Sequence, residues 1–252
     1  MAGHSKWSKV KHIKGALDAK RGMLFSKLSK EITVAARLGG GNPDLNHRLR
    51  AAVDSARAQS MPGDTIDRAI KKGTGELGTG TVEEATYEGY APGGIAILVE
   101  TATDNKNRTA ADMRSIFSKN NGSLGVPGSV AYLFHRKGRI TIPAAAGTED
   151  AVLEIVLEAG AEDLATDEDF HTVTTPPDKL YAVAAALKAA GISPESQSLT
   201  YLPENVVAVT DAAIARQVLR LCDALEENDD VLKVHSNFDI PEEVLESLND
   251  SH

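Results

Sequence analysis

The chain has 252 residues, of which 42% are hydrophobic and 25% are charged, a composition typical of globular proteins rather than of disordered or membrane proteins. Its length exceeds the ~100 to 200 residues of an ordinary domain, which predicts two or three domains. No apolar run approaches the ~18 residues of a membrane span and no secretion signal is recognisable, so we expect a cytoplasmic protein. The lone cysteine, Cys222, excludes an internal disulfide.

Charge is distributed unevenly along the chain. Residues 1–80 contain 15 Lys and Arg against 7 Asp and Glu, whereas residues 81–252 contain 12 against 29, within a total of −9. This asymmetry predicts that the N-terminal third binds a polyanion while the remainder is acidic. The alternative is a basic face that complements the acidic domains of the same chain.

The chain begins with a lysine-rich segment that has no apolar periodicity. Residues 1–15 are therefore predicted to be a flexible arm. Lysines on such an arm release counterions when they bind phosphates, and Trp7 offers a ring on which an exposed base can stack. The predicted nucleic-acid contacts, on the arm and on the helix that follows it, are Lys6, Trp7, Lys9, Lys11, Lys14, Lys20, Arg21, Lys27 and Lys30.

Three helices are predicted after the arm. Over residues 17–38 the apolar side chains fall on one side of a helix and the cations on another, so we expect one packed face and one outward face. Asn42 and Pro43 are typical of a helix start and predict a second helix that runs to about Ser60. A third helix is predicted over about residues 64–72.

The pattern changes to strands after the glycine-rich linker at residues 73–80. A hairpin of two strands is predicted first, over residues 86–90 and 95–101. A helix over 107–120 and a strand over 130–135 are predicted to follow it. The order strand, helix, strand, strand, helix, strand then spans residues 139–201, which is the ferredoxin-like order. A last strand, helix and strand are predicted over 206–209, 212–227 and 231–235.

These elements predict an α+β fold with three domains. An N-terminal three-helix domain is followed by two α/β sandwich domains of ferredoxin-like type, and the third is inserted within the second, because the last three elements are too few to form a domain alone. The predicted boundaries are 1–80 for the arm and helical domain, 81–137 with 204–240 for the second domain, and 138–203 for the insertion.

No pattern of catalytic residues is found. Gly73 to Gly78 match the dinucleotide-binding spacing, but a helix precedes them where that motif requires a strand. Cys222 lies on the apolar side of its predicted helix, which indicates a buried side chain. An acidic cluster is formed by Glu162, Asp163, Asp167, Glu168 and Asp169. Its spacing is more typical of a solvated turn than of a cation site. A metal-dependent enzyme that uses this cluster is therefore only a remote alternative. We expect no enzymatic activity, no cofactor and no metal.

Three separated motifs resemble the YebC family. They are Met1 to Trp7 (MAGHSKW), Tyr87 to Thr109 with its YEGYAPGG and TDNKNRT segments, and Asp229 to Phe238 with its DDV and HSNF segments. The family includes bacterial proteins called transcriptional regulators and a mitochondrial translational activator. The resemblance extends over nearly the whole chain and implies three domains, a cytoplasmic location and no enzymatic activity.

The resemblance implies two candidate functions. The first is a DNA-binding transcriptional regulator, and the alternative is an RNA-binding translation regulator that acts on the ribosome. The motif at Asn105, Lys106, Asn107 and Arg108 also opens a predicted helix, where free amides favour an anion. The same asparagines could instead only cap that helix. The predicted partner is thus DNA or RNA, with or without the ribosome, and the sequence leaves the oligomeric state open.

Overall fold

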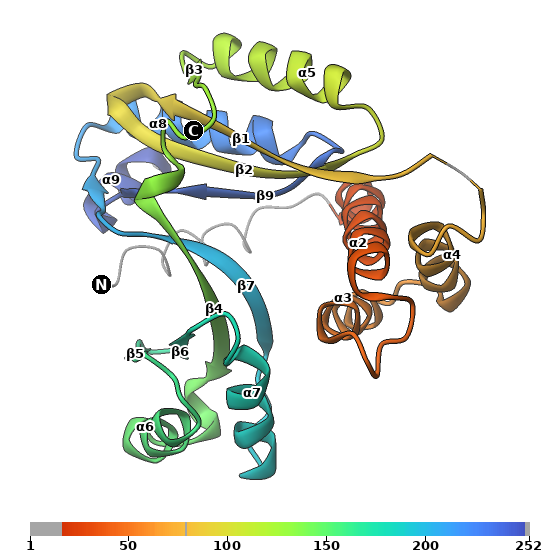
Figure 1. Ribbon diagram of the computed structural model, residues 1–252. Coiled ribbons are helices and arrows are strands. Elements are labelled where there is room, and N and C mark those ends of the chain that lie inside the picture. The colour runs from red at the N-terminus through yellow and green to blue at the C-terminus, as the bar shows by residue number, and fades with distance from the viewer. Residues whose placement is uncertain (1–16, 79, 250–252) are drawn as a thin grey trace. The chain divides into compact units, whose positions relative to one another are not determined.

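The computed structural model describes the backbone of residues 17–78 and 80–249 and the side chains from residue 22 to 248, except residue 79 (Figure 1). The described chain divides into two compact units. Phe134–Glu204 form one unit, and the segments on either side of them form the other. The architecture is α+β, with a helical domain followed by two antiparallel sheets with helices, which confirms the predicted fold class.

The helical domain contains α2 (Leu17–Gly39), α3 (His47–Ala58) and α4 (Gly63–Gly73). Their apolar faces meet in one core, to which each helix contributes fully buried or nearly buried side chains: Ile32 and Ala35 from α2, Leu49 and Val53 from α3, and Ile66 from α4. The helix α2 is also buried on a second side, where Val34 packs against Val82 and Ala102. The prediction of one packed and one outward face on this helix is therefore wrong, because the helix lies between two partners.

The second helix starts later than predicted, because Asn46 rather than Asn42 is its N-cap. The Asn46 side chain accepts a hydrogen bond from the Leu49 amide and donates to the carbonyl oxygens of Ala35 and Gly40, so it joins α2 to α3. Asn42 instead accepts from the amide two residues further on, which closes a turn. Both asparagines have the local chemistry of a cap, and the contacts to α2 decide between them.

The first sheet lies in the same compact unit as the helical domain. Its strands are β1 (Glu83–Ala91), β2 (Ile95–Thr103), β3 (Ser123–Leu124) and β9 (Val231–Ser236), in the order β3-β1-β2-β9 with every neighbour antiparallel. The remaining elements are α5 (Lys106–Lys119), α8 (Ala212–Glu226), α9 (Glu242–Asn249) and the short parallel pair β8 (Val207–Ala208) and β10 (Phe238–Asp239).

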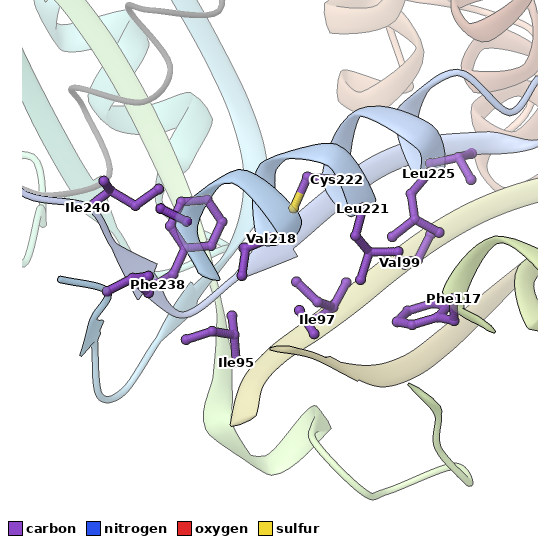
Figure 2. Packing of buried hydrophobic residues seen from close by; sticks show 14 of the residues in the cluster. Ile95, Ile97, Val99, Phe117, Val218, Leu221, Cys222, Leu225, Phe238 and Ile240 are labelled. Atoms are coloured by element: carbon purple, nitrogen blue, oxygen red, sulfur yellow. The ribbon is translucent and has the colours of Figure 1, made fainter. Parts of the chain in front are cut away.

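One face of this sheet carries the largest core of the protein. Alternate residues of β2, namely Ile95, Ile97 and Val99, point toward α8, which presents an apolar stripe (Figure 2). That stripe consists of Val218, Leu221, Cys222 and Leu225, and Phe117 from α5 joins it. Cys222 is 4% exposed, which confirms its predicted place in the core.

The hairpin between β1 and β2 forms as predicted. The two strands pair in register from Glu83 opposite Thr103 to Ala91 opposite Ile95. The three residues between them form a short 3-10 turn in which Gly93 has a φ of 80°. This left-handed conformation favours glycine, because a side chain there would be strained.

The second compact unit has the ferredoxin-like arrangement. Its elements in chain order are β4 (Phe134–Pro143), α6 (Glu149–Glu158), β5 (Asp163–Thr166), β6 (Phe170–Thr175), α7 (Leu180–Ala189) and β7 (Ser196–Pro203). The sheet order is β5-β6-β4-β7, with all neighbours antiparallel. Helices α6 and α7 bury Val152, Val156 and Leu187 against Ile140 and Ile142 of β4.

The predicted strand at Val130 to His135 is wrong. Residues Ala131–Leu133 form a 3-10 turn, and the strand that begins at Phe134 continues without a break to Pro143. The amides of Val130 and Ala131 donate to the Glu88 side chain, so they are not available for a strand partner. An apolar run alone does not show this, because the acceptor lies on a distant strand.

Gly73 permits the close approach of α4 to α2. A Cβ atom at this position would lie 2.3 Å from the Thr33 carbonyl oxygen and 2.8 Å from the Ala36 Cβ. We expect Gly73→Ala to lower the free energy of unfolding by about 1–3 kcal/mol, because the two helices would have to separate. Urea denaturation measures this change. Gly63→Ala on the same helix is the control, since its Cβ would meet nothing within 4 Å, and equal stability losses in the two variants would contradict the prediction.

Candidate nucleic-acid interface

The predicted arm lies outside the described residues. This holds for Lys6, Trp7, Lys9, Lys11 and Lys14. Lys20 and Arg21 lie in the first turns of α2, and their side chains are also outside the described part. Among the predicted nucleic-acid contacts, the structure therefore describes the side chains of Lys27 and Lys30.

Lys27 and Lys30 bind acceptors of the same chain. The Lys30 ammonium donates to the Asp229 carbonyl oxygen at 2.6 Å and to a carboxylate oxygen of Asp230 at 2.7 Å. The Lys27 ammonium donates to the carbonyl oxygen of Glu226 at the end of α8. These two cations thus fasten α2 to the acidic turn between α8 and β9. Whether they also contact nucleic acid stays a prediction.

Asp230 is the centre of a buried polar cluster. Its residue is 5% exposed, and its second carboxylate oxygen accepts from the Thr109 hydroxyl at 2.8 Å and from the Arg108 guanidinium at 3.0 Å. The Thr103 hydroxyl lies 3.2 Å from the same oxygen. Burial would raise the pKa of this carboxyl, but the hydrogen bonds from Lys30, Thr109 and Arg108 outweigh it and lower the pKa to about 2.

The residues predicted as an anion contact surround the start of α5. Asn105 is the N-cap, and its side-chain oxygen accepts from the Arg108 amide at 3.1 Å. The Lys106 ammonium pairs with Glu83 at 2.5 Å, and the Arg108 guanidinium pairs with Asp104 at 3.1 Å as well as with Asp230. The N-cap and these ion pairs already satisfy much of the positive charge of Lys106, Arg108 and the start of α5. Asn107 beside them is exposed. An external anion at this turn stays a prediction.

The other cations of the helical domain divide into a paired set and an unpaired set among the described residues. Arg37 and Arg48 pair with Glu83, Glu31 and Glu84, and Arg50 pairs with Asp44. In contrast, four cations of α3 and α4 have no carboxylate partner among the described residues: Arg57, Arg68, Lys71 and Lys72. Arg57, Arg68 and Lys71 are exposed. The signal that could have identified Arg68 and Lys71 as outward-facing is the sharp separation of apolar and charged residues along residues 63–73.

Among the described residues, the predicted acidic cluster does not meet the requirements of a metal site. No three His, Cys, Asp or Glu side chains there are close enough together to hold a metal ion. In the predicted acidic cluster, Asp167 accepts from the amides of Asp169 and Phe170 and so closes the turn between β5 and β6. Within the same described ranges, no helix has the length and apolarity that crossing a membrane requires.

The low pKa of Asp230 predicts a contribution to stability at neutral and mildly acid pH. Because the folded-state pKa of about 2 lies below the ordinary value of 3.8, the contribution is complete above about pH 4 and is lost as the pH falls through 2. The difference corresponds to about 2 kcal/mol. We expect Asp230→Asn to lower the free energy of unfolding at pH 7 and to flatten its decline between pH 4 and pH 2.

Urea denaturation at a series of pH values measures both effects. Asp54→Asn is the control, because Asp54 is an exposed carboxylate on α3, and its curve should parallel that of the unaltered chain. An Asp230→Asn variant that retained the full acid-dependent decline would contradict the assignment.

Comparison with known proteins links the whole chain to one family. A family model described as the TACO1/YebC protein N-terminal domain matches residues 5–76, and one described as the TACO1/YebC second and third domain matches residues 82–238. A crystal structure of a conserved hypothetical protein from Aquifex aeolicus is similar, with a TM-score of 0.84 and 49% identity, and the match covers 92% of this chain and 96% of that one.

Curated relatives extend over the same length. A protein of Rubrobacter xylanophilus named probable transcriptional regulatory protein is 57% identical over 246 residues, which are 97% of this chain and 98% of the relative. A protein of the same description from Desulfotalea psychrophila is 54% identical over 248 residues, 98% of this chain and 99% of the relative. The two family models together match the helical domain and the segments that form both sheets, and the chain belongs to the TACO1/YebC family.

Proposed function

We propose that this protein is a non-catalytic, cytoplasmic regulator of gene expression that binds nucleic acid through its arm and helical domain. The observation that carries the proposal is the set of exposed cations Arg57, Arg68 and Lys71, which have no carboxylate partner among the described residues. Cations that are free to release counterions supply most of the sequence-independent affinity for phosphates. The names of the relatives support a role in transcription.

The acidic part of the chain has a different role in this proposal. The net charge of residues 81–252 repels phosphates, so the domains that contain them would orient the protein or contact other proteins. We retain 1–80, 81–137 with 204–240, and 138–203 as the proposed domain boundaries.

One feature of α4 argues against base-specific DNA binding and is compatible with the alternative, which is binding to the ribosome during translation. In helix-turn-helix proteins the N-terminal residues of the second helix contact base edges. In this chain the N-terminal half of α4 carries Asp64 and Asp67, whereas Arg68 and Lys71 lie further along. Acidic side chains in the N-terminal half of α4 disfavour contacts to base edges there. Arg68 and Lys71 could still contact phosphates, and phosphates are present in a structured RNA as well as in DNA.

The exposed cations should determine the salt dependence of binding. We expect the variant with Arg57→Gln, Arg68→Gln and Lys71→Gln to bind nucleic acid about tenfold or more weakly at moderate salt. The slope of log K against log salt should become less steep by up to ~2.7 for duplex DNA, since each lost phosphate contact removes ~0.9. Fluorescence anisotropy with labelled duplex DNA and labelled ribosomal RNA measures both quantities.

A control for total charge uses three exposed cations outside the helical domain. The variant with Lys119→Gln, Arg216→Gln and Arg220→Gln loses the same charge from α5 and α8. It should change the affinity and the slope much less. Equal effects of the two triple variants would mean that only the overall charge matters, and would refute an interface on α3 and α4.

The arm should add to this interface. We expect deletion of residues 1–14 to weaken binding of nucleic acid, because it removes Lys6, Lys9, Lys11 and Lys14 together with the Trp7 ring. Thermal denaturation of the shortened chain checks that the helical domain remains folded. Binding that was unchanged in a folded, shortened chain would remove the arm from the proposed interface.

The two target classes separate in a direct comparison at physiological salt. A DNA-binding regulator should prefer a promoter fragment over bulk duplex of equal length, since specific sites bind typically 10³-fold or more tightly than non-specific DNA. A translation regulator should instead co-sediment with purified ribosomes and show no such preference. Failure of both assays would refute the proposed function.

A further inference from the structure

The sheet of the second compact unit has one face that the helices of this unit do not cover. Ile140 and Ile142 of β4 and Val173 of β6 are fully buried against α6 and α7. Because successive side chains of a strand point to opposite faces, Arg139 and Thr141 lie on the other side of the sheet. We name that side of β4, β5, β6 and β7 the open face.

Arg139 lies in the middle of the open face. The two central strands of the order β5-β6-β4-β7 are β6 and β4, and Arg139 of β4 is paired with Thr174 of β6 and with Ser198 of β7. Directly paired residues of neighbouring strands point to the same face, so a hydroxyl lies on each side of the guanidinium position. Thr172 and Thr200 occupy the next positions of that face on the same two strands.

The Arg139 guanidinium has donors that the described residues do not use. The residue is half-buried, but it makes no hydrogen bond or ion pair with any described residue, whereas Lys137 on the same face pairs with Glu162 at 2.7 Å. Burial lowers the pKa of Arg139, although an arginine remains charged at neutral pH. A partly desolvated cation with unused donors favours a ligand that is anionic and accepts hydrogen bonds.

The open face differs in charge from the rest of its unit. Residues 134–204 contain 5 Lys and Arg against 12 Asp and Glu, a balance of −7. Four of these acids belong to α6, on the other side of the sheet, and Asp163 of the open face lies on the outer strand β5. Charges in solution that are more than ~8 Å apart are largely screened at physiological ionic strength. The repulsion of phosphates by the acidic part of the chain is therefore weakest around Arg139.

We propose that the open face binds a segment of single-stranded RNA, with Arg139 as its central contact. A four-stranded sheet is a platform on which unpaired bases can lie, and a guanidinium plane can stack on a base or bind a phosphate. Serine and threonine hydroxyls donate and accept hydrogen bonds, as the ribose 2′-hydroxyl does, which favours RNA over DNA. This contact is separate from the exposed cations of α3 and α4, and it rests on the proposed function for its class of ligand.

The first test measures the affinity of the full chain for a labelled oligouridylate of about 12 nucleotides. We expect Arg139→Gln to bind it about tenfold more weakly, because a stacking plane and a phosphate contact are lost. Arg136→Gln is the matched control, since Arg136 is an exposed cation of the same strand at a position of the opposite face, and it should bind normally. Equal weakening in the two variants would overturn the inference.

A second variant tests the choice of RNA. The unaltered chain should bind the oligouridylate more tightly than an oligodeoxyuridylate of the same length. Thr174→Val with Ser198→Ala should lose most of this preference, because both hydroxyls beside Arg139 are removed while the side chains remain similar in size. Equal affinity of the unaltered chain for the two oligonucleotides would overturn the assignment to RNA.

Amide chemical shifts of the full chain locate the contact without any substitution. Addition of the oligouridylate should shift the amides of β4, β6 and β7 around Arg139 more than the amides of α6 and α7. Shifts confined to residues outside this sheet would overturn the inference. Thermal denaturation of each variant checks that a loss of binding is not a loss of folding.

Binding of duplex DNA separates this inference from the proposed function. Arg139→Gln should leave duplex binding unchanged, in contrast to the variant that lacks Arg57, Arg68 and Lys71. Normal binding of the oligouridylate by Arg139→Gln, together with weakened duplex binding by the triple variant, would overturn this inference and leave the proposed function intact. Failure of the unaltered chain to bind any of these nucleic acids would overturn both.

Discussion

The buried carboxylate of Asp230 is the contact on which the larger compact unit depends. A buried charge without partners is strongly destabilising, so its neighbours have to supply donors. Here the donors come from α2 through Lys30 and from α5 through Arg108 and Thr109, and Asp230 itself directly precedes β9. Three elements that are far apart in the chain therefore have to meet for one carboxylate to be satisfied. The contact joins the helical domain to the sheet.

This contact also explains how a basic domain coexists with an acidic remainder. Part of the positive charge of the first 80 residues neutralises carboxylates of the same chain, as Lys30 does at Asp230 and Arg48 does at Glu31 and Glu84. Another part stays exposed on α3 and α4. Among the described residues, the two interpretations of the charge asymmetry thus concern different cations of the same domain, and the proposed polyanion contact falls to the exposed set.

Glu88 is a second buried carboxylate whose hydrogen-bond donors come from a distant part of the chain, in this case from backbone amides. Its carboxylate accepts from the amides of Gly128, Val130 and Ala131, where Asp230 accepts mostly from side chains. Asp230 joins the helical domain to the first sheet. Glu88 fixes the shape of a loop that is not held by strand pairing. Both residues would look like ordinary surface acids by residue type alone, since glutamate and aspartate are rarely buried unless they are paired.

The sequence by itself determined most of the order of the helices and strands, the hairpin at Gly93, the α+β class and the family, because periodicity, turn residues and motifs are local properties of the chain. The short strands β3 and β10 and the helix α9 were not predicted. It could not distinguish Asn42 from Asn46 as the cap of α3, or recognise that residues 131–133 form a turn, because distant acceptors decide both. The tertiary structure alone decided which cations are free. Lys27 and Arg68 are alike in sequence terms, but Lys27 binds the end of α8 and Arg68 has no carboxylate partner among the described residues, since a charge is available to a ligand only where the fold leaves it unpaired.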